Sequence, residues 1–138
     1  MDYDLPGVPK NLFIGGAWRP AADGSRIAVI DPATERVIAE VADAGPDDAL
    51  AAVDAAAAAA AAWAARPPRE RGEILRHAFE LIITHKEAIA RLITLESGKA
   101  LAEARAEAAY AAEFLRWYSE EAVRILGEIG TAPRATTA

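Results

Sequence analysis

The sequence predicts an α+β chain in which two N-terminal antiparallel β-hairpins precede about four helices. Short apolar runs separated by turn residues fill the first third of the 138 residues, as strands and hairpins do. After Gly45 the apolar residues recur at helical spacing and alanine becomes abundant. No internal repeat and no long linker interrupts the chain, so we expect residues 1–138 to form a single unit.

The first hairpin is indicated by a glycine pair between two apolar runs. Leu12–Ile14 precedes Gly15 and Gly16, and Ala17–Trp18 follows them. Because glycine tolerates positive φ, a Gly-Gly pair suits the tight turn of a two-residue hairpin.

The second hairpin joins the apolar runs Ile27–Ile30 and Val37–Val41. The connection Asp31–Glu35 contains Pro32, which presets φ for a turn position. We therefore expect a second antiparallel pair.

The first two helices are separated by a proline pair. Pro46–Ala65 begins with a proline at the first helical position, and its run Ala55–Ala62 is a strong helix former. The segment Arg66–Pro68 ends it, because a residue before proline avoids the α region. A second helix starts near Arg69 and carries a broad apolar stripe suited to burial. The stripe consists of Ile74, Leu75, Ala78, Phe79, Leu81, Ile82 and Ile83.

A third helix is predicted over His85–Glu96. Thr84 and Glu87 have the spacing of a capping box at its start. Gly98 can turn left-handed after its last turn, and Lys99 complements the negative helix end.

The fourth helix begins after Lys99 and continues to about Leu126. Gly127 and Gly130 close it, and Ile129–Pro133 has the pattern of an extended segment.

Aromatic and charged residues share this fourth helix. The aromatic residues recur at three-to-four spacing, which favours a buried face, although Tyr110 and Phe114 with Glu107 could instead edge a substrate passage in a larger protein. The aromatic set is Tyr110, Phe114, Trp117 and Tyr118. Its carboxylates could pair for acid–base work, but a solvated face balanced by arginines is the favoured interpretation. They are Glu103, Glu107, Glu113, Glu120 and Glu121, with Arg105, Arg116 and Arg124.

Composition excludes several classes of partner. The net charge is −6, and no Lys/Arg run forms a patch able to neutralise phosphates, so we expect neither nucleic acid nor a membrane as partner. The apolar run Ala55–Trp63 is too short and alanine-rich for a membrane span. Met1–Gly7 lacks the pattern of a signal peptide, so we expect a cytoplasmic protein. With no cysteine, the chain can form no disulfide and has no thiol nucleophile.

The other catalytic signatures give no site. Gly15 and Gly16 lack the spacing and the following helix of a phosphate loop. His77 and His85 have no metal-ligand spacing, and no serine lies in a nucleophile elbow.

Four segments in a fixed order resemble the aldehyde dehydrogenase superfamily over about Leu12 to Pro133. They are Phe13–Trp18, Ile30–Thr34, Arg69–Arg76 and Leu95–Lys99. Glu107–Ala122 looks most like the succinate-semialdehyde dehydrogenase branch, from which the chain departs at Ala100, where proline is usual.

The resemblance implies an α+β segment of an α/β aldehyde-dehydrogenase-like fold, namely the N-terminal part of the cofactor-binding domain. The nucleotide-binding sheet and the catalytic domain are absent from residues 1–138. The full-length family enzyme uses NAD or NADP and a catalytic cysteine to oxidise a small aldehyde, here expected to be succinate semialdehyde, and it is typically a homo-oligomer. All its catalytic groups come later in the chain, so we assign no catalytic or cofactor-binding residue and expect the isolated chain to bind no cofactor and to be inactive.

The resemblance also implies a monovalent cation site. It would use backbone carbonyls of Val29 and Ile30 and the carboxylate of Glu96. The alternative is that Glu96 simply ends a helix in water.

A second hypothesis comes from another class of protein. The chain would be a non-catalytic helical interaction module, whose apolar stripes dock on a partner or on a full-length relative.

Overall fold

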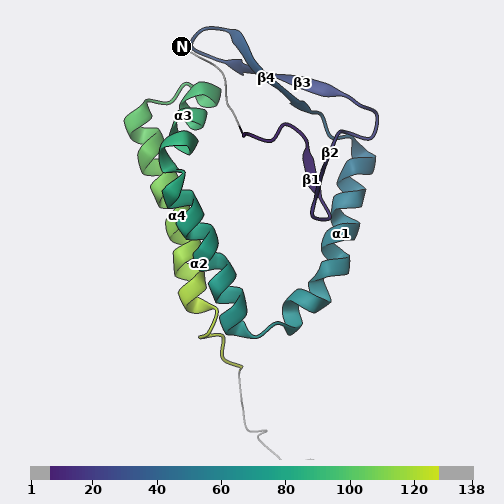
Figure 1. Cartoon of the computed structure of the whole chain (residues 1–138), viewed down its shortest axis with the longest axis vertical. Coiled ribbons are helices and arrows are strands. Elements are labelled where there is room, and N and C mark those ends of the chain that lie inside the picture. Colours follow the sequence, from purple (N-terminus) through teal and green to yellow (C-terminus); the bar gives the residue numbers. More distant parts are fainter. Residues whose placement is uncertain (1–6, 128–138) are drawn as a thin grey trace, which may run out of the picture.

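The computed structural model describes residues 7–127, which form two hairpins followed by four helices (Figure 1). The strands are β1 (Leu12–Ile14), β2 (Ala17–Arg19), β3 (Arg26–Asp31) and β4 (Arg36–Ala42). The helices are α1 (Pro46–Ala65), α2 (Pro68–Thr84), α3 (Lys86–Ser97) and α4 (Leu101–Glu121).

Both predicted hairpins are confirmed. In the first, Ile14 pairs with Ala17 across a turn in which Gly15 and Gly16 have φ values of 61° and 84°. These positive values explain why glycine is needed at both positions. The turn lies against α1, because a Cβ atom placed on Gly15 would be 3.9 Å from the Cβ of Ala55.

The second hairpin contains a local irregularity and a side-chain-stabilised turn. Val29 pairs with Ala39 but Ile30 pairs with Val37, so one residue of β4 is left over as a β-bulge. In the connecting turn the buried carboxylate of Asp31 accepts a hydrogen bond from the Ala33 N–H at 2.8 Å. This is the short-range Asx bonding that favours aspartate in turns.

Helix α1 stands apart from the other three helices in Figure 1. It packs on β1, and Asp48 is its one buried residue in the described chain. The helix begins at Pro46, as the sequence predicts, and ends before the proline pair. Its length and its mean hydropathy of 1.3 also meet the compositional criterion for a membrane-crossing helix. The sequence prediction considered only Ala55–Trp63 and judged that run too short, whereas the whole helix is long enough by length and composition. Alanine supplies most of its apolar character, and burying an alanine side chain contributes little free energy.

The remaining helices form a bundle in which α4 packs on both α2 and α3. The buried side chains of α4 are three alanines one turn apart, Ala104, Ala108 and Ala112. Small side chains let the helices approach closely, and a Cβ atom on Gly72 of α2 would lie only 2.8 Å from the Ser119 carbonyl oxygen of α4. The core of the bundle is therefore made by close backbone approach.

Two predictions about the helix ends are wrong. Thr84 is not a cap of α3, because its hydroxyl donates to the Glu80 carbonyl oxygen of α2 at 2.8 Å, and His85 instead joins the two helices. Helix α4 ends at Glu121 rather than near Leu126. The expected extended segment Ile129–Pro133 and the glycine at position 130 lie outside the described residues.

Helix α3 ends as predicted. Gly98 has φ of 71°, and its N–H donates to the Thr94 carbonyl oxygen at 2.9 Å. This is a left-handed C-cap. The same glycine lies against the β3–β4 turn, since an added Cβ would be 3.1 Å from Cγ of Pro32.

Candidate functional site

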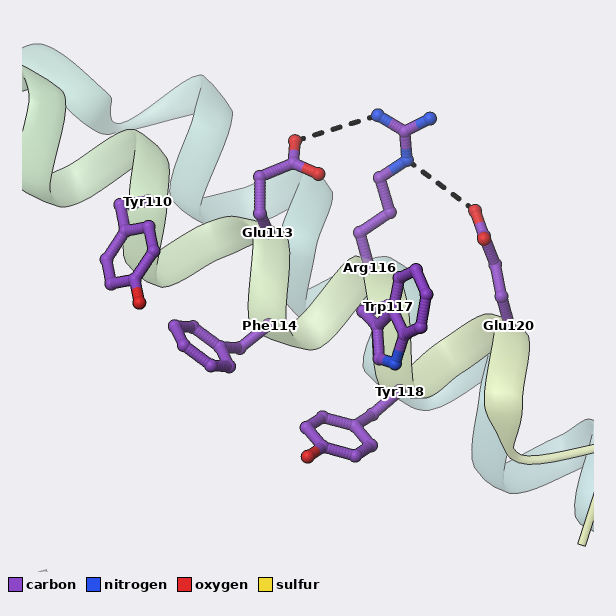
Figure 2. Close-up of a pocket in the computed structure, with 7 residues that line it drawn as sticks. All are labelled: Tyr110, Glu113, Phe114, Arg116, Trp117, Tyr118 and Glu120. Atoms are coloured by element: carbon purple, nitrogen blue, oxygen red, sulfur yellow. Dashed lines mark ion pairs between the residues drawn. The ribbon is translucent and has the colours of Figure 1, made fainter.

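One face of α4 carries four aromatic side chains that the described chain leaves in solvent. Tyr110, Phe114, Trp117 and Tyr118 are 67%, 48%, 62% and 58% exposed. Figure 2 shows Tyr110, Phe114 and Tyr118 pointing to the same side of the helix. The prediction that this face is buried is wrong, because the alanine face of α4 makes the contacts with α2 and α3 instead.

The structure brings together two of the three residues predicted to edge a substrate passage. The rings of Tyr110 and Phe114 are 5.0 Å apart between centroids, at an interplanar angle of 83°. This edge-to-face geometry is a favourable aromatic contact. The third residue, Glu107, forms an ion pair with Lys99 just before α4. Its carboxylate is therefore engaged with a lysine and not with the aromatic pair.

The charged residues of α4 form exposed ion pairs. Arg116 lies between Glu113 and Glu120, with nitrogen–oxygen distances of 3.6 Å to each (Figure 2). Such surface pairs stabilise a helix only slightly. This agrees with the solvated-face interpretation, since each carboxylate faces an arginine and neither is paired with the other for acid–base chemistry.

Another exposed ion pair joins α3 to α4. Both carboxylate oxygens of Glu87 accept from Nε of Arg105 at 3.0 Å. The hydrogen bond from Arg105 lowers the pKa of Glu87 below its ordinary value of 4.5. The pair thus favours the charged form of Glu87.

The predicted cation-binding residues lie on elements that touch. Val29 and Ile30 flank the bulge of the second hairpin, where the strand ladder is interrupted, and α3 packs on β3. Glu96 is exposed in the last turn of α3, and its carboxylate has no ion pair within residues 7–127. Backbone and carboxylate oxygens are the donors that hard cations prefer. The same described range holds no cluster of three or more His, Cys, Asp or Glu residues suited to a metal ion.

The sequence did not identify two residues whose side chains are enclosed in the structure. Asp48 is 2% exposed and accepts hydrogen bonds from the backbone N–H of Ala22 at 3.0 Å and of Gly45 at 3.2 Å. It also pairs with Arg19 at 3.3 Å. An acid three residues after a helix N-cap is a capping signal that could have identified it. The other residue is Arg71, whose Nε is buried without a hydrogen-bond partner in the described part of the chain.

The described residues thus form two hairpins and a close-packed helical bundle that leaves large apolar side chains exposed. The sequence contains no cysteine, and His77 and His85 are both exposed. The model of the aldehyde dehydrogenase family matches residues 18–138, so the chain belongs to that family.

Semialdehyde dehydrogenases are among its most similar relatives. The chain is 45% identical over 124 residues to the NADP-dependent succinate-semialdehyde dehydrogenase of Escherichia coli, covering 86% of this chain and 26% of that protein. It is also 45% identical over 119 residues to a glutarate-semialdehyde dehydrogenase of Pseudomonas aeruginosa, covering 86% of this chain and 25% of that protein. The chain thus spans about a quarter of the length of these curated relatives.

A solved structure extends the likeness to the fold. Betaine aldehyde dehydrogenase of Staphylococcus aureus, in complex with NAD⁺, superposes with a TM-score of 0.92 at 28% identity. The match covers 97% of this chain and 28% of that chain. The two hairpins and four helices therefore match part of the aldehyde dehydrogenase fold.

Proposed function

We propose that this chain is the N-terminal part of the cofactor-binding domain of an NAD(P)-dependent semialdehyde dehydrogenase. The observation that supports this proposal is the identity of about 45% to succinate- and glutarate-semialdehyde dehydrogenases over 86% of the chain. The proposed substrate class is a short aldehyde that already carries one carboxylate, as in these two relatives. The full enzyme would convert the aldehyde, water and NAD(P)⁺ into the dicarboxylate, NAD(P)H and two protons.

The chain contributes structure to this reaction and no reacting group. Attack on an aldehyde carbon requires an activated nucleophile, and the sequence has no cysteine to supply a thiolate. It also has no glycine-rich loop between a strand and a helix that would hold a dinucleotide. No residue of the chain is therefore given a catalytic or cofactor-binding role, and the isolated chain is inactive.

The aromatic face of α4 would edge the substrate passage of the full enzyme. Tyr110 and Phe114 supply an exposed, rigid pair, and the Glu107–Lys99 ion pair lies one turn before them. In the full enzyme, Phe114→Ala would then raise KM for the semialdehyde more than it lowers kcat. An unchanged KM would count against this role.

The bulge of the second hairpin and the end of α3 would hold a monovalent cation. Backbone carbonyls of Val29 and Ile30 and the carboxylate of Glu96 are the proposed ligands. If so, Na⁺ or K⁺ raises the thermal stability of the protein, and Glu96→Gln removes this dependence. Equal ion dependence in the variant would argue against the site.

A second candidate function is favoured by the exposed faces of α2 and α4. Ile74, Leu81 and Ile83 are more than 40% exposed, as are the aromatic residues of α4. The chain would then be a non-catalytic helical module that docks on a partner or on a full-length relative. A discrete oligomer of the purified chain, measured by light scattering, would favour this function over that of an enzyme part.

A chimera tests the main proposal. In it, this chain replaces the matching quarter of the E. coli succinate-semialdehyde dehydrogenase. The chimera is expected to reduce NADP⁺ with succinate semialdehyde, whereas this chain alone gives no reduced cofactor. A soluble, folded chimera without activity, or turnover by the chain alone, would contradict the proposal.

A further inference from the structure

The loop between the two hairpins contains the chain's single Asp-Gly pair, and the sequence has no Asn-Gly pair. Asp23 and Gly24 are both exposed, and a Cβ atom placed on Gly24 would meet no atom within 4 Å. An aspartate carboxyl group is open to attack by the backbone nitrogen of a following glycine, because glycine has no side chain to hinder the approach. The pair therefore has the local chemistry of a backbone isomerisation site.

Two hydrogen bonds restrain the reacting atoms in the folded chain. The Gly24 N–H donates to the Ala21 carbonyl oxygen at 2.9 Å. The Ser25 N–H donates to Oδ1 of Asp23 at 2.8 Å, and this bond lowers the pKa of Asp23 below its ordinary value of 3.8. The attacking nitrogen must give up its proton, and the carboxyl group reacts in its neutral form. Both hydrogen bonds therefore slow the reaction while the turn is formed.

The same turn is held against the start of α1 by Asp48. Ala21 is buried, and the buried carboxylate of Asp48 accepts a hydrogen bond from the Ala22 N–H at 3.0 Å. Ala22 directly precedes Asp23 in the turn. Release of Ala22 from Asp48 would thus free the backbone on which the reacting pair lies.

We propose that Asp23 is a site of spontaneous isomerisation to isoaspartate, and that the hold of Asp48 on the turn controls its rate. The Gly24 nitrogen forms a bond to Cγ of Asp23, and the amide proton leaves with the carboxyl hydroxyl as water. A second water molecule then breaks the bond between this nitrogen and the backbone carbonyl carbon of Asp23, which becomes a free carboxylate. Water is lost and regained, so the mass is unchanged and no oxidant or other co-reactant is needed.

The product alters the turn in which it forms. Isoaspartate adds one carbon atom to the backbone, because the chain then runs through Cβ and Cγ of residue 23. The Gly24 N–H is no longer placed opposite the Ala21 carbonyl oxygen, and Ala22 is drawn away from Asp48. The modification therefore weakens the contact between the loop and the start of α1. Its new α-carboxylate is the group that protein isoaspartyl methyltransferases methylate, which provides an assay.

The test follows Asp23 in the isolated chain at neutral pH and physiological temperature. Trypsin does not cleave before Pro20, so it releases residues 11–26, in which Asp23 is the single aspartate. The isomer keeps the mass of this peptide, elutes separately and accepts a methyl group from the methyltransferase. It is expected in the folded chain, and to form about tenfold faster or more in guanidinium chloride, where the turn is lost. Asp43, which is exposed and precedes Ala44, is the internal control and forms about tenfold less isomer in the unfolded chain.

Two variants separate local opening of the turn from global unfolding. Asp48→Asn weakens the acceptor of the Ala22 N–H and should speed isomerisation at Asp23 by about threefold or more. Gly98→Ala destabilises the chain elsewhere, since its added Cβ would meet Pro32 and no atom of this turn. It is the matched control and should leave the rate unchanged. Asp23→Glu would need a larger ring and should give no isomer.

Each other outcome contradicts a stated part of the proposal. Equal rates in the folded and unfolded chains would overturn control by the turn. If the folded chain has no isomer when the isomer fraction of the unfolded chain has become constant, Asp23 is not a site of the folded protein. Equal acceleration by Asp48→Asn and Gly98→Ala would overturn the role of Asp48. The proposed function stands or falls separately, because Asp23 has no part in it.

Discussion

Gly72 is the position where the packing of α2 on α4 makes its sharpest prediction. A Cβ atom on Gly72 would lie 2.8 Å from the Ser119 carbonyl oxygen and 3.6 Å from Cβ of Ala122. The first distance is about 0.6 Å short of ordinary contact, so α2 and α4 must separate locally by that amount. The nearest atom belongs to the backbone of a helix and cannot move aside as a side chain would.

The magnitude follows from two opposing effects. Alanine gains about 1 kcal/mol over glycine inside a helix. Overpacking against a rigid neighbour costs about 1–3 kcal/mol. Gly72→Ala is therefore expected to lower the free energy of unfolding by about 1 kcal/mol, and Gly72→Val by about 3 kcal/mol, since valine adds two methyl groups and a lower helix propensity.

Urea unfolding followed by circular dichroism measures this difference. Gly127→Ala is the matched control, because its added Cβ meets no atom within 4 Å. The control is expected to change stability by at most about 0.5 kcal/mol. If Gly72→Ala is more stable than the parent by about 1 kcal/mol, helix propensity alone decides and the close approach of α2 to α4 is refuted.

Three further predictions concern the hairpins and the helix ends. Asp48→Ala removes the hydrogen-bond acceptor of two backbone N–H groups, so the free energy of unfolding, measured by thermal unfolding, should fall by about 2–4 kcal/mol. Asp48→Asn should lower it by about half as much. Equal losses in the two variants would contradict this. Gly98→Ala adds a methyl group at positive φ and 3.1 Å from Cγ of Pro32, so the free energy of unfolding is expected to fall by about 1–2 kcal/mol. A variant as stable as the parent would contradict a stabilising left-handed cap at Gly98. Because Arg105 lowers the pKa of Glu87, the stability that this pair contributes is complete above about pH 4.5 and is lost as the pH falls through the lower folded pKa. Glu87→Gln should therefore lose stability near neutral pH and match the parent in acid; a constant difference at every pH would exclude this linkage.

The sequence predicted those features that local chemistry decides. Gly15 and Gly16 specified the first turn and Gly98 the end of α3, because glycine adopts positive φ, and Pro46 specified the start of α1, because its fixed φ suits the first helical position. The capping box failed because the Thr84 hydroxyl had a competing acceptor, the Glu80 carbonyl oxygen one turn earlier.

The sequence could not decide which face of α4 is covered. Periodicity marks Tyr110 and Trp117 as one face and Ala104 and Ala108 as another, but both patterns are apolar. The buried face depends on α2, where Gly72 permits a close approach that alanines can fill. The enclosure of Arg71 Nε without a hydrogen-bond partner among residues 7–127 was equally hidden, because the side chains around it come from α1, α2 and α4, which meet only in the folded chain.

The proposed function implies that the exposed faces of this chain are interior surfaces of a complete aldehyde dehydrogenase fold. Hydrogen exchange of α1 tests it most directly, because this helix packs on β1 and has Asp48 as its one buried residue among residues 7–127. The backbone amides of α1 should exchange fast in the isolated chain, unlike those of α4, and should become as protected as α4 in the chimera with the E. coli enzyme. Protection of α1 in the isolated chain, or fast exchange of α1 in the chimera, would contradict the claim.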